Sequence, residues 1–325
     1  MCIRDSNTTP LIVRATGRIN IIGEHTDYNN GFVLPCAVDK SIYFAMAKNE
    51  RETLINIRSF NYSDEITFDP ASNGILNKNG WANYIKAITD ILMEKNISVP
   101  GINCIFGGDI PIGAGMSSSA ALCCGFLFGL SEMLDLNLNR KEIALIAQQA
   151  EHRIGLNCGL LDQYAVLFSQ EKKSMFLDCQ DLTFNYCPTD LGPYQFLLVN
   201  SKIEHQLAVD SEYNKRRASC ERIAKTAEVK SLRDLSMADL LRLRDKVDPI
   251  DFKRATYVIQ ENARVLKAIE ALQNSEILVL GELLFEAHNG LSKEYEVSTK
   301  DVDQLVKIAR KSPDFIGARQ MGGGF

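Results

Sequence analysis

The spacing of hydrophobic and polar residues separates a first half that contains strands from a second half rich in helices. Short apolar runs of strand length occur at residues 11–15, 18–22, 41–47, 54–58 and 102–106. Apolar positions recur at helical spacing over residues 81–95, 118–134 and 140–153. Asn139, just before the last of these segments, is typical of a helix N-cap.

Beyond residue 200 the pattern is almost entirely helical. One further apolar strand is expected at residues 194–200, and helices are expected at 208–226, 237–246, 251–272, 276–292 and 301–311. We place a change of domain near residues 185–195, at Pro188 and Gly192-Pro193. The pattern predicts an α+β fold of two domains, a mixed α/β domain at 10–190 and a helix-rich α+β domain at 191–325.

Composition favours a soluble globular protein of the cytoplasm. The chain has 325 residues, 46% hydrophobic and 24% charged, with a formal net charge of −5. No basic block is long enough to suggest a nucleic-acid partner. Nine cysteines without a C-x-x-C pair argue against a disulfide framework and a zinc site. The most apolar run, residues 120–130, is too short to span a membrane.

A glycine- and serine-rich loop at residues 113–121, preceded by Pro111, opens directly into an apolar helix. Glycines allow close approach of the backbone to a ligand, and the N-terminus of a helix favours an anion such as phosphate. The loop is not a Walker A motif, because no lysine follows its glycines. On this loop alone, a flexible turn before a buried helix is an equally good interpretation.

A second segment, residues 17–35, places four ionisable side chains close together. Arg18 precedes an apolar run, and Glu24, His25 and Asp27 follow it beside a turn rich in Asn and Gly. Polar groups that converge after a strand suit a polyhydroxylated ligand such as a sugar. The alternative is a solvated hairpin turn with incidental charges.

Residues 17–35 resemble the signature of the galactokinases, and the serine loop resembles the second motif of the GHMP kinase superfamily to which they belong. The resemblance runs in order from about Val13 to the last residue. Further similar segments are Trp81-Ala82-Asn83-Tyr84, residues 158–164, 200–201 with 211–217, 261–266 and 295–298, and residues 317–325 resemble the third, glycine-rich motif. The resemblance implies the GHMP fold and the transfer of phosphate from ATP to the anomeric hydroxyl of galactose, in a protein expected to be a monomer.

The resemblance also implies a role for individual residues. Asp162 falls on the catalytic base, and Arg18 on the arginine that would stabilise this carboxylate and the transferring phosphoryl group. Ser119 and Glu151 match the Mg²⁺ site, and Glu24, His25, Asp27, Gly159 and Tyr213 match sugar contacts. The ATP-binding set is Pro111, Gly113, Ala114, Gly115, Met116, Ser117, Ser118, Ser119 and Ala120, with Trp81 either near the adenine or packed in the core.

Three departures from the family pattern are Thr16 for the usual Pro, Met116 for Leu, and Gln320-Met321 for Met-Thr. Because Gln320-Met321 replaces Met-Thr, the contacts of the third motif's side chains to phosphate stay an open question. Two alternatives to a galactokinase are an N-acetylgalactosamine or other sugar-1-kinase, and a non-catalytic sensor of galactose and ATP. The intact serines at 117–119 and Asp162 favour catalysis.

The chain stops within the third glycine-rich motif, and its first six residues continue no family pattern. We therefore expect a fragment, cut at both ends, with weak kinase activity or none. We also expect an unpaired strand edge or an exposed apolar face.

Overall fold

The computed structural model describes residues 9–49, 53–72, 74, 76, 80–111, 113–203 and 209–324, so the expectation for the first six residues lies outside this range. Contacts divide the chain into two units. Unit 1 consists of Met1–Arg18, Val38–Ile112 and Met116–Phe168, and unit 2 of Ile19–Ala37, Gly113–Gly115 and Ser169–Phe325. This division differs from one boundary near residue 190, because strands β1 (Leu11–Asn20) and β3 (Pro35–Lys48) each continue from one unit into the other.

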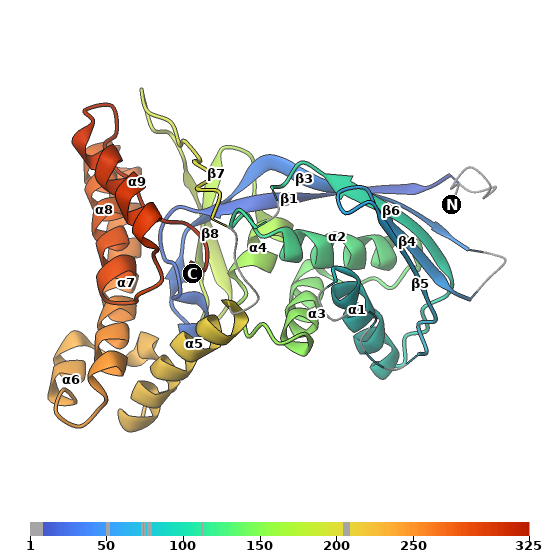
Figure 1. Ribbon diagram of the computed structural model, residues 1–325, viewed down its shortest axis with the longest axis horizontal. Coiled ribbons are helices and arrows are strands. Elements are labelled where there is room, and N and C mark those ends of the chain that lie inside the picture. The colour runs from blue at the N-terminus through green and yellow to red at the C-terminus, as the bar shows by residue number, and fades with distance from the viewer. Residues whose placement is uncertain are drawn as a thin grey trace. The chain divides into compact units, whose positions relative to one another are not determined.

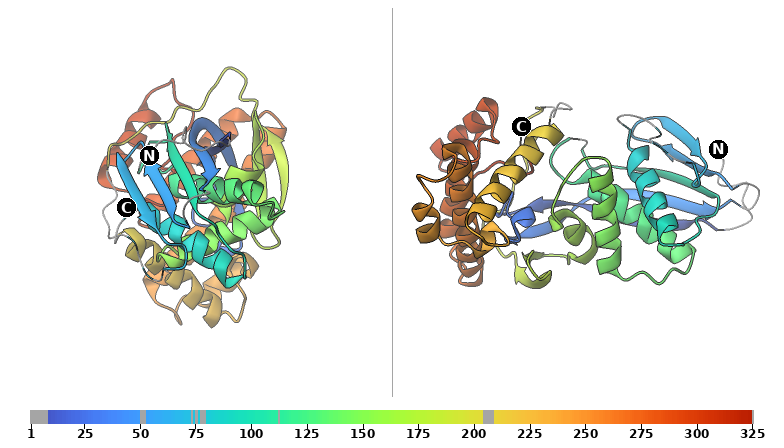
Figure 2. Two further views of the ribbon diagram at one scale, coloured as in Figure 1. Left: turned by 90° about the vertical axis from the view of Figure 1, so that its right-hand side faces the viewer. Right: turned by 90° about the horizontal axis from the view of Figure 1, so that it is seen from below.

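Unit 1 contains most of a five-stranded sheet with helices on one face (Figures 1 and 2). The strand order is β1-β3-β6-β4-β5, with β4 at Ile55–Ser59, β5 at Asp64–Phe68 and β6 at Ile102–Gly108. Strand β6 pairs antiparallel with β3, from Ile42 opposite Gly108 to Lys48 opposite Ile102, and parallel with β4. The helices are α1 (Ala82–Glu94), α2 (Ser118–Met133), α3 (Arg140–Arg153) and α4 (Leu161–Phe168).

The helices of unit 1 form for reasons that can be traced to their sequences. Helix α2 is apolar around most of its circumference, as a helix buried between other layers must be. Helix α3 begins with the predicted cap, because Asn139 Oδ1 accepts from the Glu142 amide at 3.0 Å. The Glu142 carboxylate accepts in return from the Asn139 amide at 2.8 Å. This capping box satisfies two amides that have no partner within the helix.

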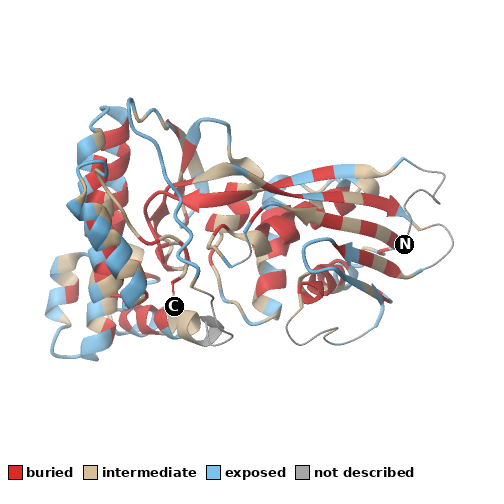
Figure 3. Ribbon diagram, turned by 45° about the horizontal axis from the view of Figure 1, so that its top comes forward, coloured by how far each residue is buried: buried red, intermediate tan, exposed pale blue. Residues whose placement is uncertain are grey.

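Unit 2 combines a small antiparallel sheet with the helices expected from the second half of the sequence. Its sheet has the order β2-β7-β8, formed by Phe32–Val33, Lys173–Asp178 and Thr183–Pro188. Its helices are α5 (Val209–Thr226), α6 (Met237–Arg242), α7 (Pro249–Gln273), α8 (Ile277–Lys293) and α9 (Lys300–Lys311), with short 3-10 turns η2 (Asp27–Asn29) and η3 (Leu232–Asp234). Buried residues on α7 and α8 alternate with exposed ones, whereas α9 buries none (Figure 3).

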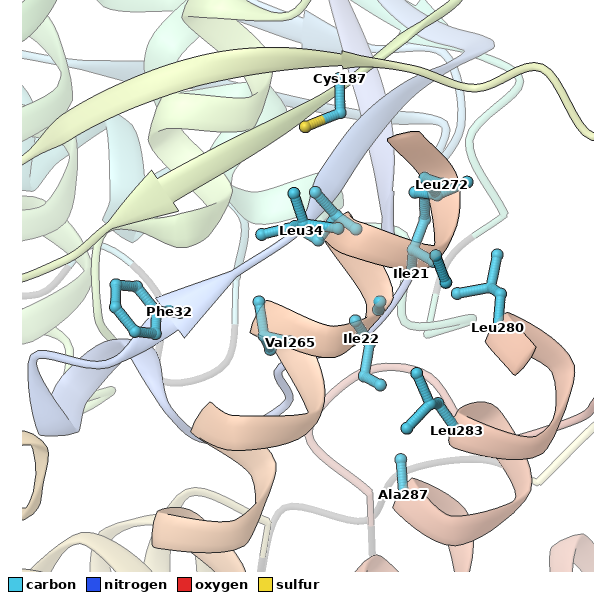
Figure 4. Packing of buried hydrophobic residues seen from close by; sticks show 13 residues of the cluster. Ile21, Ile22, Phe32, Leu34, Cys187, Val265, Leu272, Leu280, Leu283 and Ala287 are labelled. Atoms are coloured by element: carbon cyan, nitrogen blue, oxygen red, sulfur yellow. The ribbon is translucent and has the colours of Figure 1, made fainter. Parts of the chain in front are cut away.

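The core of unit 2 is built where residues from the turn between β1 and β3 pack on α7 and α8. Figure 4 shows Ile21, Ile22 and Leu34 beside Val265 of α7 and Leu283 of α8. A second apolar cluster joins α5, η3, α6 and α7 around the buried rings of Tyr257 and Tyr295.

The prediction of a strand at residues 194–200 is wrong. No strand is assigned between residues 191 and 203, and the side chains of Leu197 and Val199 are 63% and 64% exposed. An apolar run becomes a strand only when a neighbouring strand pairs with it. No strand in the described part of the chain pairs with this run.

No helix among the described residues is both long enough and apolar enough to cross a lipid bilayer.

The packing of α8 generates a test of stability. A Cβ atom on Gly281 would lie 2.2 Å from the carbonyl oxygen of Ile316, so the two backbones touch where no side chain fits. We expect Gly281→Ala to lower the free energy of unfolding by roughly 1–3 kcal/mol through overpacking, measured by urea denaturation. Glu282→Ala, at the neighbouring exposed position, is the control and should change it by less than about 0.5 kcal/mol. Equal effects would contradict the backbone contact.

Candidate active-site residues

Unit 1 brings together the two residues predicted to be catalytic. Arg18 lies in β1 and Asp162 in the first turn of α4, and both Nε and Nη2 of Arg18 lie 2.6 Å from Oδ1 of Asp162. The arginine side chain is 7% exposed and the aspartate side chain 28% exposed. The carboxylate is therefore fixed from the protein side by a buried cation while a ligand can still reach it from solvent.

A second carboxyl group, that of Glu151, is buried near Asp162 at the end of α3. It accepts hydrogen bonds from the Gln163 side-chain amide and from the Ser119 hydroxyl, and the Cys158 thiol lies 3.7 Å away. Burial, together with the negative charge of Asp162, raises the pKa of Glu151 to about 7, although the three hydrogen bonds oppose this. A nearby cation would favour the ionised form.

The surroundings of Glu151 fit a magnesium ion. Mg²⁺ prefers hard oxygen ligands and usually takes only one or two from the protein, and Glu151 and Ser119 offer a carboxylate and a hydroxyl in hydrogen-bond contact. No group of three or more His, Cys, Asp or Glu suited to a metal is found among the described residues. Two protein donors would leave the other coordination positions of such an ion to water or to a ligand.

The serine loop enters α2 through a left-handed residue. Ser117, just before the helix, has φ 57° and ψ 50°, and its hydroxyl oxygen is buried without a hydrogen-bond partner in the described structure. Because α2 begins at Ser118, the amides of its first turn have no partner within the helix. A polar ligand such as a phosphate oxygen would satisfy both groups.

In unit 2, the glycines of this loop lie against the third glycine-rich motif. A Cβ atom on Gly115 would lie 3.1 Å from the Met321 carbonyl oxygen, and one on Gly322 would lie 3.1 Å from Gly115 Cα. Both glycines have positive φ, 70° and 87°. A side chain at either position would make a tighter contact than is usual, so glycines suit this close approach of the two motifs.

His25 is held at both ring nitrogens. Nε2 lies 3.0 Å from the Gly323 carbonyl oxygen, which can only accept, so Nε2 carries the proton. Nδ1 then accepts from the Tyr28 hydroxyl at 2.8 Å, and that hydroxyl lies 2.7 Å from the Tyr295 hydroxyl. Burial lowers the pKa of His25 to about 4, so the neutral ring is the one that makes these contacts.

Glu24 is also engaged within the protein. Its Oε1 atom accepts from Nη2 of Arg319 and from the amide of Gly322, both at 3.0 Å. Only 5% of Glu24 is exposed. The sugar-signature residues Glu24 and His25 thus contact two consecutive glycines of the third motif.

The remaining predicted residues lie in a ring cluster, in turns and beside the ends of helices and strands. Tyr213 packs on His25 and Tyr28 with ring centroids 5.5 and 5.2 Å apart, and Asp27 begins the turn η2. Gly159 is buried just before α4, and Pro111 follows β6.

Trp81 is 8% exposed and packs edge-on against Phe106, with the ring centroids 5.0 Å apart. This contact favours core packing of Trp81 over a contact with adenine.

Sequence reasoning missed four residues that shape these sites: Gln163, Tyr28, Tyr295 and Arg319. All four lie in segments already singled out by resemblance. The signal was therefore available, but only the folded chain shows which groups these side chains contact.

Comparison with known proteins identifies the family. A family model for the GHMP kinases N terminal domain matches residues 83–170, and one for the galactokinase galactose-binding signature matches residues 4–48. A galactokinase of Thermotoga maritima is 38% identical over 314 residues, which cover 96% of this chain and 86% of the relative. The chain belongs to the galactokinase family.

Other galactokinases agree with this assignment. That of Chloroflexus aurantiacus is 36% identical over 97% of this chain and 81% of the relative. The crystal structure of Lactococcus lactis galactokinase complexed with galactose is similar with a TM-score of 0.92 and 31% identity, over 99% of this chain and 85% of that one. A Methanococcus jannaschii mevalonate kinase, at 16% identity and a TM-score of 0.63, shares the fold. The predicted family and fold class are confirmed.

The buried neutral ring of His25 predicts a pH dependence of stability in this galactokinase family member. Its folded-state pKa of about 4 lies below the ordinary 6.5. The stabilisation is therefore complete above pH 6.5 and is lost as pH falls toward 4. Between pH 7 and pH 5 we expect His25 to account for a loss of about 2 kcal/mol in the free energy of unfolding.

The measurement is urea denaturation across this pH range for the wild type and for His25→Gln. The variant should be less stable at pH 7 but should show the shallower pH dependence. If the free energy of unfolding changed with pH in the same way in both proteins, His25 would not be buried as the neutral ring.

Proposed function

We propose that this protein transfers the γ-phosphoryl group of ATP to the anomeric hydroxyl of galactose, forming ADP and galactose 1-phosphate. The observation that carries the proposal is the Arg18–Asp162 contact at 2.6 Å in a chain of the galactokinase family. Phosphoryl transfer needs positioning, charge neutralisation and an acceptor for the hydroxyl proton.

Asp162 is proposed as the proton acceptor. Its side chain is partly exposed, so the sugar hydroxyl can approach the carboxylate, while Arg18 holds the carboxylate in one orientation. As the hydroxyl proton moves to Asp162, the hydroxyl oxygen attacks the γ-phosphorus and the bond to the β-phosphate oxygen breaks. The positive charge of Arg18 also stabilises the negative charge that develops on the transferring group.

The phosphates are proposed to bind at the glycine and serine motifs. The positive φ at Gly113 and Gly115, the buried Ser117 hydroxyl and the first amides of α2 are features of an anion-binding loop. Ser119 and Glu151 would hold Mg²⁺, which neutralises phosphate charge when bound. Glu24, His25, Asp27, Gly159 and Tyr213 are proposed as sugar contacts.

The substrate prediction is tested by coupling ADP release to a spectrophotometric assay with a panel of sugars. Galactose should be the best substrate, and glucose, which differs at C4, should be poor, because a site that pairs one hydroxyl rejects a ligand that leaves its polar groups unmatched. Turnover of N-acetylgalactosamine but not of galactose would move the assignment to the rival sugar kinase. Binding of galactose and ATP without any ADP release would favour a sensor.

The role of Asp162 is tested by Asp162→Asn, which preserves shape but removes the proton acceptor. We expect kcat to fall by roughly 10²-fold or more, with galactose still bound in calorimetry. Asp64→Asn, at an exposed position in β5 of the same unit, is the matched control and should retain wild-type kcat. A kcat near wild type in Asp162→Asn would exclude this residue as the base.

A further inference from the structure

Arg319 is one of the side chains that join the galactokinase signature, residues 17–35, to the third glycine-rich motif within unit 2. Its Nε donates to the Ile21 carbonyl oxygen at 2.7 Å, and its Nη2 donates to the carbonyl oxygen of Asn20 and, at 3.0 Å, to Glu24 Oε1. Its Nη1 donates to the Gln320 carbonyl oxygen at 2.9 Å. One guanidinium therefore contacts the end of β1, the signature carboxylate and its own motif.

Glu24 extends this connection to the glycines. The same Oε1 atom that accepts from Arg319 accepts from the Gly322 amide at 3.0 Å. The next residue, His25, donates from Nε2 to the Gly323 carbonyl oxygen at 3.0 Å. Two adjacent side chains of the signature thus hold an amide and a carbonyl of consecutive glycines.

The environment makes these contacts strong. The side chains of Arg319 and Glu24 are only 5% and 7% exposed, so their ion pair is poorly screened by water. The glycines themselves have little conformational preference: Gly322 and Gly324 both have positive φ. Their conformation is therefore set by what they are bonded to.

We propose that Arg319 is a positioning residue that couples galactose binding to nucleotide binding. This inference rests on the proposed function, in which Glu24 contacts the sugar and Gly113 and Gly115 contact phosphate. Gly322 lies against Gly115, since a Cβ atom on Gly322 would lie 3.1 Å from Gly115 Cα. A sugar that bonds to Glu24 acts on a side chain that Arg319 holds and that is already bonded to Gly322. The ligand that binds first therefore orders groups that the second ligand also needs, and each ligand tightens the binding of the other.

The test is calorimetric and does not depend on turnover. The dissociation constant of galactose is measured for the full chain with and without a saturating non-hydrolysable ATP analogue, and the ratio of the two values is the coupling factor. In the wild type we expect a factor of about 5 or more, the lower end of typical coupling between sites. In Arg319→Met the factor should fall to about 1 while each ligand alone still binds.

Three further variants separate positioning from general structural damage. Arg319→Lys, which keeps the charge but has fewer donors, should retain part of the coupling. The double variant Glu24→Gln/Arg319→Met should have the same factor as Arg319→Met alone, because the arginine acts through Glu24. Arg310, on α9 of the same unit, forms an exposed ion pair with Glu282 of α8. Arg310→Met removes this pair and should leave the coupling factor at the wild-type value.

Several outcomes would overturn the inference. One is a factor near 1 in the wild type, and another is an unchanged factor in Arg319→Met. If Arg319→Met binds neither ligand, the Arg319→Lys variant decides: an undiminished factor there contradicts the role of the guanidinium contacts, and a reduced one supports it. A wild type that binds the analogue but no galactose would instead contradict the proposed sugar substrate.

Discussion

The burial of the turn between β1 and β3 against α7 is the interaction on which the candidate sugar-binding residues depend. Ile22 and Leu34 are fully buried, and burial of such side chains contributes roughly 1.5–3 kcal/mol each. Polar groups of the same helix fix the backbone between them, because Glu261 accepts from the Gly23 amide at 2.9 Å and Asn262 accepts from the Phe32 amide at 2.8 Å. Helix α7 thereby fixes the backbone at Gly23 and Phe32, and Glu24 and His25 between them contact Gly322 and Gly323.

Two buried carboxyl groups, Glu24 in unit 2 and Glu151 in unit 1, have different surroundings. In unit 2, Glu24 is matched by Arg319 and an amide, so its charge is compensated within the protein. In unit 1, the donors to Glu151 among the described residues are neutral, and burial together with the negative charge of Asp162 raises the pKa of Glu151 to about 7. This difference in surroundings is the reason why Glu151, and not Glu24, is proposed to hold Mg²⁺.

Much of the fold and the family could be predicted from sequence because the signals are local. The cap at Asn139, the apolar helix after the serine loop and the five helices beyond residue 200 each depend on neighbours a few residues apart. The prediction of a strand at 194–200 was wrong, because a strand needs another strand to pair with and the residues of the apolar run do not specify that partner. The contact between Arg319 and Glu24 could not be predicted for the same reason, because 295 positions separate the two residues and no spacing rule connects them. The interleaving of the units through β1 and β3 is likewise a property of the folded chain alone.

The position of the signature in the chain also has a consequence for biosynthesis. Phe32 and its hydrogen-bond partner Asn262 are 230 residues apart. At a synthesis rate of about 5–20 residues per second, α7 leaves the ribosome roughly 10–45 s after the signature does. During that interval Ile21, Ile22 and Leu34 have no helix to pack against. Unit 2 therefore folds late, around a segment made early, and the nascent chain presents an apolar stretch to chaperones for most of its translation.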